Sequence, residues 1–235
     1  MDTRTRHSLK KDSFAQATAS SMSWLSGHRS GVLRWVVAAI VVVVVGVGSL
    51  VAWNIRSNQA QAALGEAMDT YTAPLAQPGA PPETGVYNTA GDRAKAANQQ
   101  FAAVAAKYGW LIEGKKAHYF AGVTDEDLGQ NGTAETELKA AAGSWDHNLS
   151  NLAKLALAGL YQQTNRNSQA IDIYNALAAK PSDTVSTAVA QLDLADLYAA
   201  TGDQEKAKTL WAKVKDADKD GAAGSIASQK LTGKQ

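Results

Sequence analysis

The sequence contains no cysteine in its 235 residues, and it has only five prolines. The missing cysteine excludes disulfide bonds, thiolate metal ligands and thiol nucleophiles. Four of the five prolines fall at positions 74, 78, 81 and 82, with glycines at 79 and 85. Proline has a fixed φ and no amide hydrogen, so it ends helices. Residues 74–88 are therefore predicted to be a loop or semi-rigid spacer.

Motifs for catalysis or for cofactor binding are also missing. The sequence has no glycine-rich phosphate loop, no Gly-x-Ser-x-Gly elbow and no paired carboxylate constellation. Its four histidines are scattered and lie far from partners at metal-ligand spacing. We therefore predict that the chain is not an enzyme and has no cofactor, metal or small-molecule substrate.

Two acidic segments are candidates for a metal site or an acid–base site, and neither has the residues that such a site needs. Asp216, Asp218 and Asp220 precede Gly221 as in a calcium loop, but Ala227 stands where a bidentate glutamate is needed. A solvated turn is the expected alternative. Residues 125–127 read Asp-Glu-Asp, which we interpret as an exposed acidic end of a helix.

Charge is nearly balanced, with a formal net charge of +1, so the composition does not suggest nucleic-acid binding. Its distribution is uneven, because residues 1–34 hold six basic groups against two aspartates. Few large apolar residues occur in this part, and residues 1–30 are predicted to form a disordered cytoplasmic tail.

A long uncharged run follows this basic segment. Trp35 to Trp53 spans 19 residues, nine of them valine. As a helix the run measures about 28 Å, close to the hydrocarbon thickness of a bilayer. A tryptophan at each end suits the two membrane interfaces. Residues 31–54 are therefore predicted to be a single transmembrane helix.

The basic flank predicts the orientation, since lysine and arginine are retained on the cytoplasmic side. The N-terminus should stay in the cytoplasm and the C-terminal part should cross the membrane. A cleaved signal peptide is the competing interpretation, because Ala60-Gln61-Ala62 offers a cleavage site. A signal peptide has a shorter apolar run than residues 35–53, and its cleavage site follows that run more closely.

A pattern returns every 36 or 37 residues in the C-terminal half. It reads small residue, then Tyr, then a turn residue, then Ala-x-x-x-aromatic. The copies are Ala158, Tyr161, Asn165, Ala170 and Tyr174; Ala195, Tyr198, Gly202, Ala207 and Trp211; and a weaker Gly122, Asp125, Gly129, Ala134 and Leu138. A fixed period in this range is typical of stacked helical hairpins, and such stacks usually bind proteins.

The expected fold is all-α, with a transmembrane helix followed by an α-solenoid of about three and a half hairpins. Residues 55–88 form a juxtamembrane helix (to about residue 72) and the proline-rich linker, and residues 89–235 form the repeat domain. The predicted pairs are 54–72 with the helix that carries Ala97 and Phe101, 114–128 with 133–143, 149–163 with 167–179, and 184–200 with 204–217. A last capping helix is expected at 222–231.

These motifs resemble the tetratricopeptide repeat. The family pattern of Leu-Gly/Ala-x-x-Tyr, a turn and Ala-x-x-x-Phe/Tyr is matched by residues 157–174 and again by residues 194–211. Asp125 stands where the family has tyrosine. The whole arrangement is also similar to the YfgM-like proteins, which are ancillary subunits of the bacterial Sec translocon. That resemblance implies a bacterial inner-membrane protein with a periplasmic domain that works beside chaperones on exported proteins. A scaffold of another envelope complex, for cell division or outer-membrane assembly, is the alternative.

The resemblance to tetratricopeptide repeats also implies a partner surface, because the first helix of each hairpin lines the concave face in that family. By alignment, the inward positions are Lys116, Tyr119, Val123, Glu126, Leu155, Gly159, Gln162, Leu192 and Asp196. Their mixed apolar and weakly polar character suits partner helices or unfolded segments. The three tryptophans at 110, 145 and 211 are expected in the core or at hairpin junctions.

Overall fold

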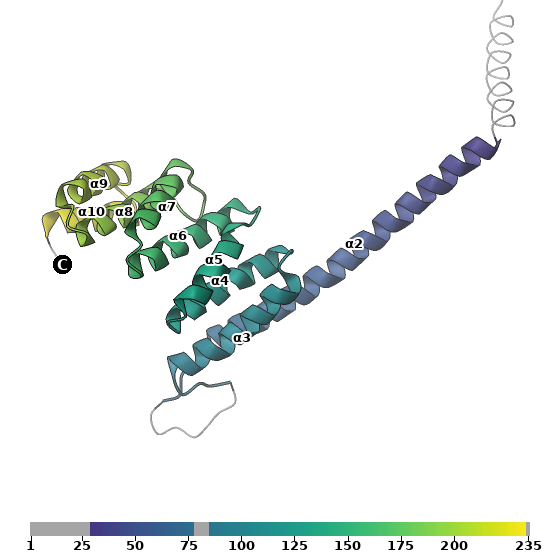
Figure 1. Cartoon of the computed structure of the whole chain (residues 1–235), viewed down its shortest axis with the longest axis horizontal. Helices are drawn as coiled ribbons and strands as arrows, with labels where there is room; N and C mark the ends of the chain where they lie inside the picture. Colours follow the sequence, from purple (N-terminus) through teal and green to yellow (C-terminus); the bar gives the residue numbers. More distant parts are fainter. Residues whose placement is uncertain (1–28, 78–84, 234–235) are drawn as a thin grey trace, which may run out of the picture. The chain divides into compact units, whose positions relative to one another are not determined.

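The structure is a computed structural model, and it describes residues 29–77 and 85–233. Within these ranges the named elements are all α-helices, joined by turns (Figure 1). An isolated bridge pairs Leu75 with Tyr87 across the linker. The all-α prediction is confirmed. The predicted tail lies almost wholly outside the described residues, as do the linker prolines at 78, 81 and 82.

The first described helix, α2 (Arg29–Tyr71), contains the apolar run. Its length and composition would allow it to cross a membrane, and none of its most apolar window is buried within the protein. Trp35 and Trp53 are 79% and 53% exposed. A helix that leaves so much apolar surface uncovered is unsuited to water, so α2 is a candidate membrane span. The chain divides into two compact units between Arg56 and Ser57.

The part of α2 that follows Ser57 belongs to the second unit and forms a hairpin with α3 (Ala90–Tyr108). One apolar cluster joins the two helices and contains Ala60, Leu64, Ala67, Ala97, Phe101 and Val104. The small alanines allow close approach of the helix axes, and Phe101 fills the space between them. The predicted pairing of 54–72 with the helix of Ala97 and Phe101 is confirmed.

Three further hairpins and a closing helix follow. They are α4 (Ile112–Asp127) with α5 (Asn131–Ala142), α6 (His147–Gln163) with α7 (Asn167–Ala179), α8 (Thr187–Ala200) with α9 (Gln204–Ala217), and then α10 (Ala222–Thr232). Each helix from α3 onward contacts the next, and α4 also contacts α6, as α8 contacts α10. The first helices of the hairpins thus form an inner layer, and α5, α7 and α9 form an outer one. The predicted hairpins and capping helix are confirmed.

The repeat period has a physical basis in the turns within the hairpins. The second residue after each inner helix is left-handed, with φ of 72° at Gly129, 58° at Asn165 and 90° at Gly202. The next amide then donates back to a carbonyl five residues earlier: Gln130 to Asp125 at 2.7 Å, Arg166 to Tyr161 at 2.7 Å, and Asp203 to Tyr198 at 2.8 Å. This bond closes a Schellman motif, which ends one helix and redirects the chain into the next.

Because each helix reverses the direction of the chain, alternate turns gather at two ends of the stack. The turns at 109–111, 143–146, 180–186 and 218–221 share the end where Ser57 begins the unit, which we call the Ser57 end. Two bonds tie neighbouring elements there: Lys115 Nζ donates to Ala140 O at 3.2 Å, and Asn151 Nδ2 donates to Lys180 O at 3.0 Å. The turns at 128–130, 164–166 and 201–203 form the opposite end.

One expectation about a single residue is wrong, and one is met in only one of its two forms. Asp125 is only 2% exposed, because it occupies the inner position that tyrosine fills in the other repeats, so it faces α3 instead of water. Trp145 is 75% exposed and Trp110 is 50% exposed, since both lie in turns beyond the helix contacts. They lie at hairpin junctions, which is one of the two places expected for them, and not in the core. Trp211, by contrast, is buried as expected.

Candidate protein-binding surface

The inner layer of helices carries the predicted partner-binding residues. We define the inner-helix face as the positions on α4, α6 and α8 that the repeat alignment turns inward. They are Lys116, Tyr119, Val123, Glu126, Leu155, Gly159, Gln162, Leu192 and Asp196. The structure places them on three successive inner helices, but it gives them unequal access to solvent.

On α4 the residues of this face grade from exposed to half-buried. Lys116 is exposed, while Tyr119, Val123 and Glu126 are half-buried. The Tyr119 ring meets Phe120 edge-on with centroids 5.1 Å apart. Burial raises the pKa of the Tyr119 hydroxyl, and the nearby Tyr71 and Glu126 raise it further, so this group stays neutral. This part of the face can offer apolar contact together with one lysine charge.

On α6 the face borders an open groove of about 460 Å³ between the third and fourth hairpins. Its lining is rich in amides and comprises Gly159, Gln162, Gln163, Asn165, Asn167, Leu197, Ala200 and Thr201. Amide side chains both donate and accept hydrogen bonds without carrying charge. The Gln163 amide donates to Glu126 of the preceding repeat. Leu155, in contrast, packs half-buried against two apolar clusters.

On α8 the two predicted residues serve the packing of the last helices. Leu192 is only 7% exposed and belongs to the cluster that joins α8, α9 and α10. Asp196 accepts hydrogen bonds from Trp211 Nε1 at 2.9 Å and from Lys230 Nζ at 2.6 Å. Both residues are therefore already engaged within the chain, and α10 accounts for much of that engagement.

A carboxylate beside Asp196 was missed by reasoning from the sequence. Burial raises the pKa of Asp193 to about 6, Asp196 raises it as well, and Lys230 lowers it. Burial and these two aspartates also raise the pKa of Tyr174. The available signal was an Asp-x-x-Asp spacing inside a helix whose neighbouring residues are apolar.

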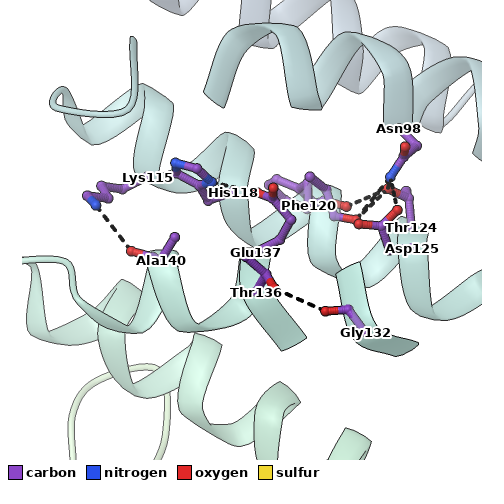
Figure 2. A network of polar contacts seen from close by, with 11 residues as sticks. Asn98, Lys115, His118, Phe120, Thr124, Asp125, Gly132, Thr136, Glu137 and Ala140 are labelled. Atoms are coloured by element: carbon purple, nitrogen blue, oxygen red, sulfur yellow. Dashed lines mark hydrogen bonds and ion pairs between the residues drawn. The ribbon is translucent and has the colours of Figure 1, made fainter. Parts of the chain in front are cut away.

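Polar contacts that join the first and second repeats lie beside this face (Figure 2). Asn98 of α3 donates to the Asp125 carboxylate at 2.8 Å and approaches Thr124 Oγ1 at 3.0 Å. Burial raises the pKa of Asp125, and the hydrogen bond from Asn98 partly offsets that effect. His118 Nδ1 lies 2.5 Å from the Glu137 carboxylate, which ties α4 to α5. These contacts position α4 between its neighbours.

A second polar centre joins α5 to the next hairpin. The Glu135 carboxylate accepts from Tyr161 Oη at 3.0 Å and pairs with Arg166 at 2.7 Å, and the Arg166 guanidinium lies 4.2 Å from the Tyr161 ring centre. Hydrogen bonds from Lys139 and Arg166 lower the pKa of Glu135 to about 2. Glu135 therefore stays charged and links successive hairpins.

Within the described ranges, no three of the potential metal-ligand side chains (His, Asp and Glu) come together in a way that could hold a metal ion. In the acidic segment after α9, the Asp218 carboxylate accepts the Gly224 amide at 3.1 Å. That bond satisfies an amide in the first turn of α10, which is an ordinary structural role for an aspartate. His118 is likewise paired with Glu137 in the helix contact described above.

Comparison with protein families gives one match that covers most of the chain. Residues 33–233 match the family model of the tetratricopeptide repeat-like domain. None of the curated proteins compared with the chain matches it. The matched range includes the apolar part of α2 and every hairpin of the stack. The chain therefore belongs to the tetratricopeptide repeat-like domain family.

Proposed function

We propose that the protein is a membrane-anchored adaptor that holds partner proteins on its repeat domain. The observation that carries the proposal is the joining, in one chain, of a candidate membrane span to a stack of tetratricopeptide-like hairpins. Repeat stacks of this kind present extended surfaces to other proteins, and an anchor confines that surface to a membrane. Such a scaffold acts by binding, without a catalytic step.

The proposed location is a bacterial inner membrane, with the N-terminus in the cytoplasm and the repeat domain in the periplasm. Six basic residues precede the span, whereas Arg56 is the one lysine or arginine among the twenty residues that follow it. This asymmetry favours retention of the N-terminal flank on the cytoplasmic side.

The proposed contact surface is the part of the inner-helix face that stays accessible. Lys116, Tyr119, Val123 and Glu126 supply it on α4, and Gln162 beside the amide-lined groove supplies it on α6. Leu155, Leu192 and Asp196 support it from within the packing. Its mixed character suits a partner helix or an unfolded segment better than a highly charged peptide.

In its finer form, the proposal places the adaptor at the Sec translocon, where it assists exported proteins together with periplasmic chaperones. The support is the similarity of the whole arrangement to the YfgM-like proteins. Fold alone does not determine function, so the partners have to be identified directly.

The test is crosslinking of the tagged full chain in its native membranes, followed by gentle solubilisation and identification of bound proteins. One variant carries Lys116→Ala and Gln162→Ala on the inner-helix face. Its matched control carries Lys213→Ala and Gln169→Ala, which change the same residue types at exposed positions of the outer layer. The inner variant should lose most of the specific partners, and the outer variant should keep them.

Recovery of translocon subunits and exported chains would support the finer proposal. Recovery of a different envelope complex, with translocon subunits at background level, would replace it with the scaffold alternative. If both variants retain all partners, binding does not use the inner-helix face and that assignment is wrong.

A further inference from the structure

Large apolar side chains are rarely exposed in the part of the second unit that the structure describes. Those above one third exposure are Leu75, Trp110, Trp145 and Ile226. Both tryptophans lie in turns at the Ser57 end, between α3 and α4 and between α5 and α6. At the opposite end, the turns at 128–130, 164–166 and 201–203 hold no aromatic residue; they read Leu-Gly-Gln, Thr-Asn-Arg and Thr-Gly-Asp. Both exposed tryptophans of the described second unit therefore lie at one end of the stack.

This end is also the one where the chain leaves the apolar run. Ser57 lies four residues after Trp53, and four residues span at most about 14 Å in any conformation. The Ser57 hydroxyl donates to the Glu113 carboxylate at 3.3 Å, which brings the first turn of α4 beside it. Trp110 immediately precedes that turn. Trp110 thus lies beside Ser57, the residue at which the second unit begins.

The second tryptophan lies on the same side for an independent reason. Lys115, in the first turn of α4, donates to the carbonyl of Ala140 at 3.2 Å, so the last turn of α5 lies next to the first turn of α4 (Figure 2). The α5–α6 turn with Trp145 begins three residues later. Two exposed aromatic rings from successive turns between hairpins therefore share one end of the stack.

The charges around Trp110 suit an anionic surface. Residues 107–116 contain three lysines and one glutamate, and Lys107 and Lys116 are exposed. Lysines near a bilayer are attracted to anionic lipid headgroups, and tryptophan rings favour the headgroup layer, where one edge is apolar and the other is hydrated. The few residues of α2 between Trp53 and Ser57 make such a weak contact effectively intramolecular.

We propose that Trp110 and Trp145 lie in the headgroup layer of the membrane that α2 crosses, so that the Ser57 end of the repeat domain is docked on the bilayer. This inference rests on the membrane span of the proposed function. Docking in this way would give the chain a second attachment to the bilayer in addition to the span.

The test uses the natural absence of cysteine, which allows a single nitroxide label at any chosen site. The full chain is reconstituted in vesicles of phosphatidylcholine and phosphatidylglycerol. Labels at Ala106→Cys and His147→Cys flank the two tryptophans, and Gln130→Cys reports the opposite end; all three positions are exposed. Val43→Cys reports the span itself. Collision rates with oxygen and with a water-soluble nickel complex measure the depth of each label.

We expect severalfold lower nickel collision rates at positions 106 and 147 than at position 130. Combining Trp110→Ser with Trp145→Ser should raise the rates at 106 and 147 to the value at 130, while position 43 stays in the hydrocarbon. An unchanged circular dichroism spectrum would show that the double variant remains folded.

Aqueous rates at 106 and 147 in the parent, with position 43 in the hydrocarbon, would overturn the docking and leave the anchor intact. An aqueous rate at position 43 would overturn both. Protection of 106 and 147 in native membranes but not in the vesicles would show that these tryptophans meet a protein instead of lipid, and would also overturn the proposal.

Discussion

At the scale of single residues, one of the closest backbone approaches in the repeat domain lies where α4 begins against the end of α3. A Cβ atom built on Gly114 would lie 1.9 Å from the carbonyl oxygen of Tyr108. That oxygen belongs to the backbone and cannot turn away. The glycine is therefore required by the closeness of the two helices, although its place near a helix start gives no hint of this in the sequence.

Gly114→Ala should lower the free energy of unfolding by about 1–3 kcal/mol, as expected for overpacking in a well-filled contact. Chemical denaturation of the full chain in detergent micelles, followed by circular dichroism, measures the change. Gly65→Ala is the matched control, because a Cβ there meets nothing within 4 Å. It should instead stabilise its helix by about 0.5–1 kcal/mol. Equal effects of the two changes would contradict the close contact.

The buried carboxylate of Asp193 should make the folded chain less stable as pH rises, whereas most carboxylates in folded proteins have the opposite effect. Its pKa is raised from 3.8 to about 6 in the folded chain. Below pH 3.8 the group is protonated in both states, and as pH rises toward 6 the unfolded chain releases its proton first. The free energy of unfolding therefore falls as pH rises from about 3.8 to about 6.

Asp193→Asn should match the parent near pH 3.5 and exceed its stability at pH 7 by about 1–2 kcal/mol, since the carboxylate keeps part of its solvation. Thermal unfolding across this pH range measures the difference. Asp172→Asn removes an exposed carboxylate from α7 and serves as the control. A gain as large for Asp172→Asn as for Asp193→Asn would show that the effect comes from net charge instead of burial.

At the scale of elements, the hairpins follow from features that recur along the chain. The left-handed positions at Gly129, Asn165 and Gly202 end the inner helices, and small residues at a constant offset let neighbouring helices approach. Both signals are local, so the helix pairs could be predicted from the sequence. The bond from Asn98 to Asp125 could not, because it depends on the register in which α3 packs against α4.

Asn98→Ala should destabilise the chain by about 1–3 kcal/mol, because Asp125 would remain buried without its donor. Gln99→Ala removes an exposed amide side chain from the same helix and should have little effect. Denaturation of both variants gives the comparison, and a double-mutant cycle with Asp125→Ala isolates the coupling between Asn98 and Asp125. Additive effects in that cycle would mean that the contact contributes nothing.

The candidate surface was predictable only in part, and the reason again lies in contacts between elements. The repeat alignment identifies which positions of each inner helix point inward. It does not show that α10 covers the last of them. Leu192 and Asp196 are used by the packing of α9 and α10 through Trp211 and Lys230, so the accessible face is displaced toward α4 and α6.

At the scale of the whole molecule, α10 closes the stack that α2 opens. Ala223 and Ala227 cover Ala207, Trp211 and Val214 of the preceding helix. A stack of hairpins needs such an end, because the last inner face would otherwise meet water.

A chain that ends after Asp220 should lose several kcal/mol of stability, on the order expected for uncovering this apolar cluster. It should also self-associate through the exposed Trp211 surface. Thermal unfolding and sedimentation in micelles measure the two effects. Lys230→Ala in the intact chain keeps α10 but removes the ion pair with Asp196 and the charge 5.9 Å from the Trp211 ring, and it should cost no more than about 1 kcal/mol. Normal stability of the shortened chain would mean that α10 is dispensable.

The alternation of the helices also governs how the protein can change in length. Adding or removing one hairpin leaves every later turn at its present end of the stack, whereas adding a single helix would exchange the two ends for everything that follows. Duplication in whole hairpins therefore preserves which side carries the aromatic turns. By the same parity, α10 ends away from Ser57, so a tag or fused domain placed after it extends from the end without tryptophan.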